Sequence, residues 1–266
     1  MIKTFKDLTA IPLSLKVDDI AVAKPPASTT HRRRLEIIEA GKYIDDDKYN
    51  SRYKHKDVKE KLKESYKNCC FCEVHDQQLE VEHYRPKSKY YWLAYSWDNL
   101  TLSCTKCNKS KSNNFQILGV SAVPKVKGDD LTDIHQLSSV YDVVESPLLI
   151  NSDKVSEEEL NAFIYDEDGS VTSDNTRVKY TIETCGLNRH NLREERKKIW
   201  DSFKSKFNAR VLEYSSNPEA LETALRTLIK DFGTDANDSS VPFQSFRRYV
   251  ISAGWIQKLL YSLLNN

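Results

Sequence analysis

The chain has 266 residues, with 40 Lys and Arg against 39 Asp and Glu and a formal net charge of +1. This balance excludes a protein that coats nucleic acid through bulk charge, and a hydrophobic content of 39% excludes a disordered chain. Because only 7 residues are glycine, few positions suit tight turns with positive φ, which favours helices over a many-stranded barrel.

The charge is distributed unevenly along the sequence. Residues 50–111 carry 13 basic and 8 acidic side chains, residues 112–175 carry 3 and 13, and residues 176–266 carry 15 and 10. An acidic segment therefore lies between two basic ones. We expect the acidic side chains of residues 129–174 to form a solvated surface, and a second hypothesis is that they dock a basic partner.

The sequence shows no sign of membrane insertion or secretion. No run of 18 apolar residues is long enough to span a bilayer, and the first residues, MIKTFKDLTAIPLSLK, lack the apolar core of a signal peptide. We therefore expect a cytoplasmic protein without membrane contacts, whose six cysteines form no disulfides.

Periodicity and turn residues predict an α+β chain that is predominantly helical. The expected elements of the first half are an arm over 1–50 with a helix that begins near Thr30, a charged helix over 53–67, strands over 79–86 and 100–104, and a helix over 105–115. Those of the second half are an irregular segment over 116–150, a hairpin over 162–171, and helices over 181–187, 191–214, 220–232 and 243–264. The predicted domains are 1–50, a chemical module over 51–118, an acidic connection with a small hairpin over 119–175, and a helical accessory region over 176–266.

Two Cys-x-x-Cys pairs carry the strongest chemical signal. The first is Cys69 with Cys72 and the second is Cys104 with Cys107. A two-residue spacer lets a tight turn aim both thiolates at one ion, and two such turns complete a tetrahedral zinc site. We expect structural zinc here, although a redox-active or simply buried pair stays an alternative. Two cysteines remain. We expect Cys70 to be a packed neighbour thiol and Cys185 to be a core residue.

Four further polar residues lie between or beside the cysteine pairs. Glu82 and His83 end the first predicted strand, Asn99 precedes the second strand, and Asn108 follows Cys107 directly. A Glu-His pair alone is weak evidence. Its place at the end of a strand with zinc on both flanks makes it a candidate catalytic centre.

This combination resembles the HNH endonuclease family and its ββα-metal catalytic unit. The matching pattern is Cys-x-x-Cys, an acid followed by His, Asn, and then Cys-x-x-Cys-Asn-x-x-Lys, which ends at Lys111. The final motif position is Asn108 rather than the His that names the family. The resemblance implies His83 as general base, Glu82 and Asn108 as ligands of one Mg²⁺ or Mn²⁺ ion, and Asn99 as a positioning residue.

A narrower resemblance extends over about residues 55–200. The stretches EHYRPKS, YWLAYSWDNL, SCTKCNKSK and TIETCGLNRHNLREERKK resemble PtuB-type HNH nuclease subunits of Septu and retron anti-phage defence systems. This resemblance implies a DNA substrate and a partner that is a separate SMC-like or ABC-type ATPase. The sequence itself has no GxxxxGK[ST] motif, which agrees with ATP control in another chain.

Basic and aromatic side chains surround these motifs. We expect phosphate contacts from several of the basic residues, each of which is alternatively a solvated surface charge: Arg85, Lys87, Lys89, Lys106, Lys109 and Lys111. The aromatic residues between 90 and 97 are expected to pack rather than to stack on bases.

Two other classes of protein stay open at this point. One is a non-catalytic zinc-knuckle module that binds nucleic acid or protein, which would not need the acid-His pair. The other is a thiol redox protein built on Cys-x-x-Cys, which would not hold stoichiometric zinc.

Overall fold

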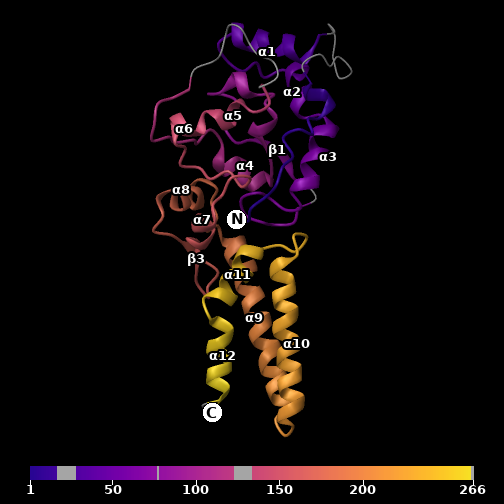
Figure 1. Cartoon of the computed structure of the whole chain (residues 1–266), viewed down its shortest axis with the longest axis vertical. Coiled ribbons are helices and arrows are strands. Elements are labelled where there is room, and N and C mark those ends of the chain that lie inside the picture. The colour runs from indigo at the N-terminus through magenta and orange to yellow at the C-terminus, as the bar shows by residue number, and fades with distance from the viewer. Residues whose placement is uncertain (17–27, 77, 123–133, 265–266) are drawn as a thin grey trace.

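The computed structural model describes residues 1–16, 28–76, 78–122 and 134–264. About half of the chain is helical, with two small sheets. Figure 1 shows a compact part, which we call the head (described residues up to 189), and a set of helices that project from it, which we call the stalk (residues 190–264). The predicted fold class, a mainly helical α+β chain with a helical C-terminal region, is confirmed.

The head begins with short helices that pack against one another. They are η1 (Leu13–Leu15), α1 (Thr30–Glu39), α2 (Asp47–Tyr53) and α3 (Lys56–Ser65). Helix α1 begins where the sequence predicted, and the hydroxyl of Thr29 caps it by accepting a hydrogen bond from the Arg32 amide at 3.0 Å. The helix expected over 53–67 is confirmed as α3, and it begins only at Lys56 because the backbone of His55 is extended.

A small ββα unit lies at the centre of the head. Strands β1 (Glu80–His83) and β2 (Leu100–Ser103) pair antiparallel, and α4 (Thr105–Lys111) follows at once. The predicted order of strand, loop, strand and helix is therefore confirmed. Helix α4 is shorter than expected, since Ser112 has a φ of 45° and ends it.

The loop between the two strands is filled with aromatic residues. It contains η2 (Tyr91–Leu93) and η3 (Trp97–Asn99). Four of the five aromatic side chains between residues 90 and 97 are buried, as the packing interpretation predicted: Tyr90, Trp92, Tyr95 and Trp97.

The remaining part of the head covers one side of this unit. It contains α5 (Leu137–Val140), α6 (Asp142–Glu145), α7 (Glu157–Asn161), the hairpin strands β3 (Ile164–Tyr165) and β4 (Val171–Thr172), and α8 (Thr176–Thr184). The hairpin confirms the Asp-Gly turn expected there, and Gly169 supplies its positive φ of 80°. Helices α5 and α6 lie in a segment that the sequence left irregular.

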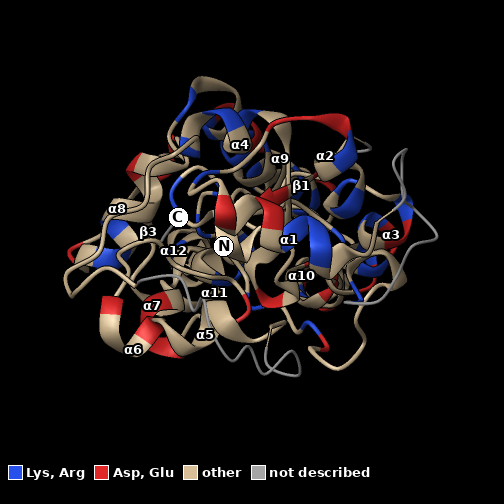
Figure 2. Ribbon diagram, turned by 90° about the horizontal axis from the view of Figure 1, so that it is seen from above, with Lys and Arg blue, Asp and Glu red and all other residues tan. Residues whose placement is uncertain are grey.

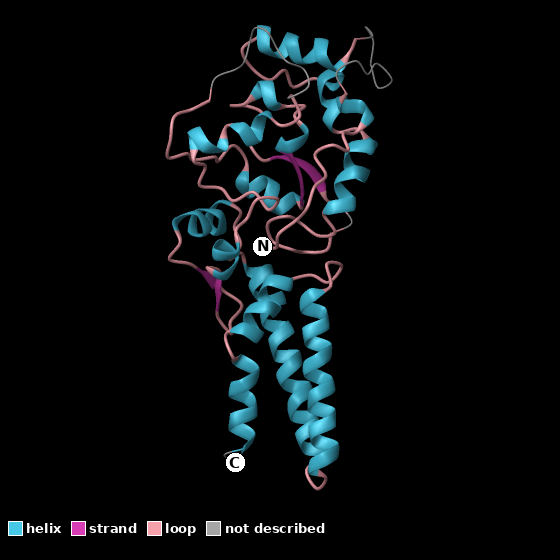
Figure 3. Ribbon diagram, viewed as in Figure 1, coloured by secondary structure: helices cyan, strands magenta, loops and turns pink. Residues whose placement is uncertain are grey.

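The stalk consists of α9 (His190–Glu213), α10 (Pro218–Asn237), α11 (Gln244–Ser252) and α12 (Trp255–Leu264). In Figure 3, α9 and α10 run side by side away from the head, and α12 projects separately from them. The one helix expected over 243–264 is two helices, because Gly254 adopts a φ of 74° between them. Among the described residues, no helix has the length and apolarity needed to cross a membrane.

The N-terminal residues pack into the head. The Lys6 ammonium donates a hydrogen bond to the backbone oxygen of Trp97 at 3.0 Å, and the Ser14 amide donates one to Asp57 Oδ2 at 2.8 Å. The division of the chain into four domains stays a prediction.

Candidate active site and metal centre

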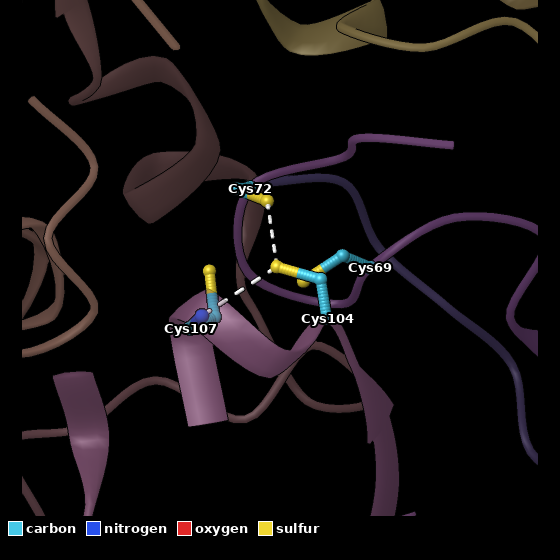
Figure 4. Close-up of side chains that lie close together, drawn as sticks. All are labelled: Cys69, Cys72, Cys104 and Cys107. Atoms are coloured by element: carbon cyan, nitrogen blue, oxygen red, sulfur yellow. Dashed lines mark hydrogen bonds between the residues drawn. The ribbon is translucent and has the colours of Figure 1, made fainter. Parts of the chain in front are cut away.

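Four cysteines converge between the ββα unit and the loop that precedes it. The sulfur atoms of Cys69, Cys72, Cys104 and Cys107 all lie within 4.8 Å of one another and are buried (Figure 4). Zinc–sulfur bonds of about 2.3 Å in a tetrahedron place neighbouring sulfurs about 3.8 Å apart. The Cys72 and Cys104 sulfurs lie 3.7 Å apart, so this cluster has the dimensions of a tetrathiolate zinc site.

The backbone forms the turns that such a site needs. The Glu73 amide donates to the Cys69 carbonyl at 2.9 Å, and Glu73 itself adopts a φ of 62°, which closes the first turn. The Cys70 amide donates to the Leu102 carbonyl at 3.0 Å and fixes that turn to β2. We call residues 68–74 the first knuckle. Cys104 is the N-cap of α4, so the second pair begins the helix.

The chemistry of the thiols also fits a cation. Burial raises the pKa of Cys69, and hydrogen bonding with Cys104 raises the pKa of Cys72. Several thiolates crowded into a buried space are unfavourable without a compensating positive charge, and a dication supplies one. Cys70 and Cys185 are buried outside this group, as expected.

His83 is buried at the end of β1, and its two ring nitrogens have different environments. Its Nε2 lies 3.0 Å from the carbonyl oxygen of Ala94. Because a carbonyl only accepts, Nε2 carries the proton, and Nδ1 of the neutral ring is left with the lone pair. Burial lowers the pKa of His83 to about 3, which keeps the ring neutral near pH 7.

Asn99 joins the two segments that surround His83. Its Oδ1 accepts from the Arg85 amide at 2.8 Å, and its Nδ2 donates to the carbonyls of Arg85 at 3.1 Å and Leu93 at 3.3 Å. Asn99 is fully buried. These contacts fix the loop that carries the Ala94 carbonyl, and they favour a positioning role over proton transfer.

Glu82 and Asn108 each form a hydrogen bond between β1 and α4, but with different partners. Glu82 Oε1 accepts from the Lys111 ammonium at 2.7 Å, and that ammonium also donates to the His83 carbonyl at 2.8 Å. Asn108 Nδ2 donates to Glu80 Oε2 at 3.0 Å. Glu82 and Asn108 thus have separate hydrogen-bond partners. Burial raises the pKa of Glu82, and Lys111 opposes that rise.

The structure corrects the role expected of Arg85 and Lys111. Both are fully buried, so neither presents its charge to a phosphate. The three guanidinium nitrogens of Arg85 donate to Glu145, Ser138 and Asp142 at 2.7 to 2.8 Å. Sequence patterns missed this because the partners lie far along the chain.

Tyr53 and Lys54, which the motifs did not indicate, lie near His83 together with Lys87, for which a phosphate contact was expected. The Tyr53 ring packs edge-on against the His83 ring with centroids 4.6 Å apart. The Lys54 and Lys87 ammonium groups lie 5.8 and 5.7 Å from the same Tyr53 ring. Lys54 and Lys87 therefore place positive charge near His83.

Basic side chains are exposed on and near α4. Lys89, Lys106 and Lys109 are exposed. Figure 2 shows Lys and Arg on α4, both signs of charge on α1–α3, and Asp and Glu on α6 and α7 at another edge of the head. A polyanion would meet favourable potential on the side of α4.

Comparison with known proteins identifies this module. Residues 68–114 match a family model described as HNH endonuclease. This segment is an HNH endonuclease domain. The match covers both cysteine pairs, Glu82, His83, Asn99 and Asn108, and it confirms the family resemblance that the motifs indicated.

The chain is also similar to two Septu proteins of Bacillus mycoides (strain KBAB4). It is 34% identical to Septu protein PtuB over 117 residues, which cover 37% of this chain and 40% of the relative. It is 28% identical to Septu protein PtuA over 161 residues, which cover 54% of this chain and 21% of the relative. The chain therefore spans less than half the length of either relative. The resemblance to PtuB-type HNH proteins is confirmed, and no solved structure matches the chain.

Proposed function

We propose that this protein is a metal-dependent HNH endonuclease that hydrolyses phosphodiester bonds of DNA and serves as the effector nuclease of an anti-phage defence complex. The observation that carries the proposal is the contact between His83 Nε2 and the Ala94 carbonyl within an HNH domain. It leaves Nδ1 as an acceptor on a neutral imidazole, which is what a general base for water needs.

The catalytic divalent ion would be held by oxygen atoms. Glu82 and Asn108 offer a carboxylate and an amide oxygen, the hard ligands that Mg²⁺ or Mn²⁺ prefers. When bound, the ion supplies charge neutralisation at the scissile phosphate and the leaving oxygen. His83 takes the proton of the attacking water, and Asn99 holds the loop that orients its ring.

The substrate phosphates would be bound by exposed or half-exposed cations. Lys54 and Lys87 both lie near the Tyr53 ring that packs on His83, at 5.8 and 5.7 Å, and Lys106 and Lys109 are exposed on α4. These residues take the place of the buried Arg85 and Lys111. Such contacts position a duplex without reading its bases.

Zinc would have a separate role from the catalytic ion. The four sulfurs connect the first knuckle with the start of α4, so they hold together a small unit whose two strands have four residues each. A metal that crosslinks such a unit contributes folding free energy. The protein would act in the reducing cytoplasm, where cysteines stay available to bind zinc.

The partner would be a separate SMC-like or ABC-type ATPase. Similarity to both a PtuA and a PtuB protein supports a role in a Septu assembly. We expect the chain to co-purify with that ATPase when the two are expressed together. Elution as separate species at micromolar concentrations would contradict this part of the proposal.

The nuclease proposal is tested by cleavage assays with the purified chain, alone and with the ATPase. We expect supercoiled plasmid DNA to be nicked with Mg²⁺ or Mn²⁺ and to stay intact with EDTA. DNA binding without cleavage in either sample would favour the non-catalytic zinc-knuckle module. Cleavage of RNA but not of DNA would refute the proposal that DNA is the substrate.

The phosphate contacts are tested by single substitutions. Lys54→Ala and Lys87→Ala should weaken DNA binding and flatten its dependence on salt, because each removes one phosphate contact. Lys230→Ala, an exposed lysine on α10, is the matched control and should bind DNA as the wild type does.

A further inference from the structure

The four-cysteine cluster has a fifth neighbour that comes from the base of the stalk. Arg189 is the N-cap residue of α9, directly before the stalk begins. Its NH1 lies 3.3 Å from the Cys107 sulfur, and its NH2 lies 3.3 Å from the Cys72 sulfur and 3.7 Å from the Cys104 sulfur. One guanidinium therefore contacts three of the four sulfurs.

The backbone around Arg189 holds the guanidinium in this place. NH1 also donates to the carbonyls of Cys185 and Gly186, both at 3.2 Å. Gly186 has a φ of 59°, so the turn between α8 and α9 depends on a residue that adopts the left-handed region. The Arg189 side chain is thus fixed from the sulfur side and from its own turn.

Charge and shape both suit an arginine at this point. Four thiolates around one Zn²⁺ carry a formal charge of about −2, which is costly in a buried site unless nearby groups offset it. The planar guanidinium donates from two nitrogens to different sulfurs at once, whereas a lysine ammonium is a single point of charge.

The first knuckle contacts the stalk at two further points. Asn68 Nδ2 donates to the carbonyls of Ser239 at 3.1 Å and Val241 at 3.2 Å, in the loop between α10 and α11. Glu73 Oε2 accepts from the Ser245 amide at 2.9 Å, in the first turn of α11. The residues on both sides of Cys69 and Cys72 therefore bind the stalk.

We propose that Arg189 is the outer-shell residue of the zinc site and that it couples zinc retention to the docking of the stalk on the head. The proposal rests on the structural zinc assigned above. Hydrogen bonds to metal-bound groups strengthen the site, and their loss weakens metal binding by about 10- to 100-fold in proteins. Coupling is reciprocal, so the same bonds hold the start of α9 when zinc is bound.

The experiment compares Arg189→Ala and Arg189→Lys with Arg193→Ala, all in the full chain. Arg193 lies one turn further along α9 and pairs with Asp168, so it is a matched arginine that does not touch the sulfurs. Zinc content is measured first, followed by the rate of zinc transfer to a chromogenic chelator. The thiolate-to-cobalt charge-transfer band is then measured after cobalt replaces zinc, and hydrogen exchange measures the protection of the first turns of α9.

We expect one zinc per wild-type chain and at least about tenfold faster zinc release from Arg189→Ala. Arg189→Lys should release zinc at an intermediate rate, and Arg193→Ala at the wild-type rate. The cobalt band should shift in Arg189→Ala, together with faster exchange at the start of α9. A residue that only fills space would leave the band in place.

Two results would overturn the inference, and they differ. Full zinc content with wild-type release rates and an unchanged cobalt band in Arg189→Ala and Arg189→Lys would refute the role of Arg189 alone. A wild-type chain without zinc would refute the zinc assignment itself. Neither result depends on nuclease activity, so both are distinct from a failure of the proposed function.

Discussion

The head and the stalk use charged side chains in opposite ways. In the head, Arg85 pairs with Glu145 at 2.8 Å with both side chains fully buried, and the partners are 60 residues apart in sequence. In the stalk, Arg226 pairs with Glu222 one turn away, with both side chains largely exposed. The Arg85–Glu145 pair therefore fixes tertiary structure, whereas the Arg226–Glu222 pair lies on the surface of a single helix.

This contrast explains part of the acidic segment. A solvated surface was correctly expected for Glu157 and Glu158, which are exposed, but it was wrong for Glu145 and Glu159, which are buried. Glu159 completes the capping box of α7 and pairs with Arg177. Some of the negative charge between residues 112 and 175 thus compensates basic residues inside the molecule.

Loss of zinc should separate the two regions most strongly. Structural zinc contributes about 10–16 kcal/mol in zinc-finger peptides, and in this protein it would crosslink only the head. We expect Cys104→Ser to lose zinc and to increase hydrogen exchange across β1, β2 and α4. The far halves of α9 and α10 should stay protected. Equal loss of protection in both regions would show that the stalk depends on the head for its own folding.

Arg85→Ala should have the next largest effect, on the stability of the head. It leaves Glu145 buried without its partner, which typically costs about 3–5 kcal/mol. Urea unfolding followed by the fluorescence of the buried tryptophans would measure the change. A loss below about 1 kcal/mol would mean that the charge of Glu145 is not buried as the structure shows.

The pH dependence of stability should also differ between the regions. Burial lowers the pKa of His135 in the head to about 4, well below the value of about 6.5 in an unfolded chain. Between those values the unfolded state binds a proton that the folded state does not, so the stability of the head should fall as pH decreases. His135→Gln should reduce this dependence when urea midpoints at about pH 7.5 and pH 5.5 are compared. An unchanged dependence would exclude His135 as its source.

Arg226→Ala should have the smallest effect. Exposed pairs one helical turn apart contribute about 0.3–0.5 kcal/mol, so the urea midpoint should hardly move. A loss of stability as large as that caused by Arg85→Ala would show that ion pairs contribute equally to stability in the head and the stalk.

The sequence predicted different parts of the two regions for physical reasons. The stalk helices follow from local periodicity, and the order of β1, β2 and α4 follows from the motif. The break at Gly254 and the start of α3 after His55 depend on single backbone conformations that periodicity does not reveal.

Contacts between residues far apart in the sequence could not be predicted from local patterns. The spacing of the cysteine pairs predicts the zinc site, and the adjacency of Glu82 and His83 predicts the catalytic centre. Arg189 reaches Cys72 across 117 residues, and Lys111 reaches Glu82 across 29, with no local pattern to indicate either contact. Surface charge was therefore overestimated for the basic residues nearest the catalytic centre.

The rate of plasmid nicking by His83→Ala, relative to wild type at equal zinc content, tests whether His83 is the general base. The matched control is His190→Ala, an exposed histidine on the first turn of α9. Loss of a general base should lower the cleavage rate by about 10²- to 10⁴-fold with Mg²⁺ or Mn²⁺ present, under conditions where urea unfolding shows both variants to be folded and zinc content matches the wild type. Cleavage by folded His83→Ala at the wild-type rate would show that His83 is not the general base.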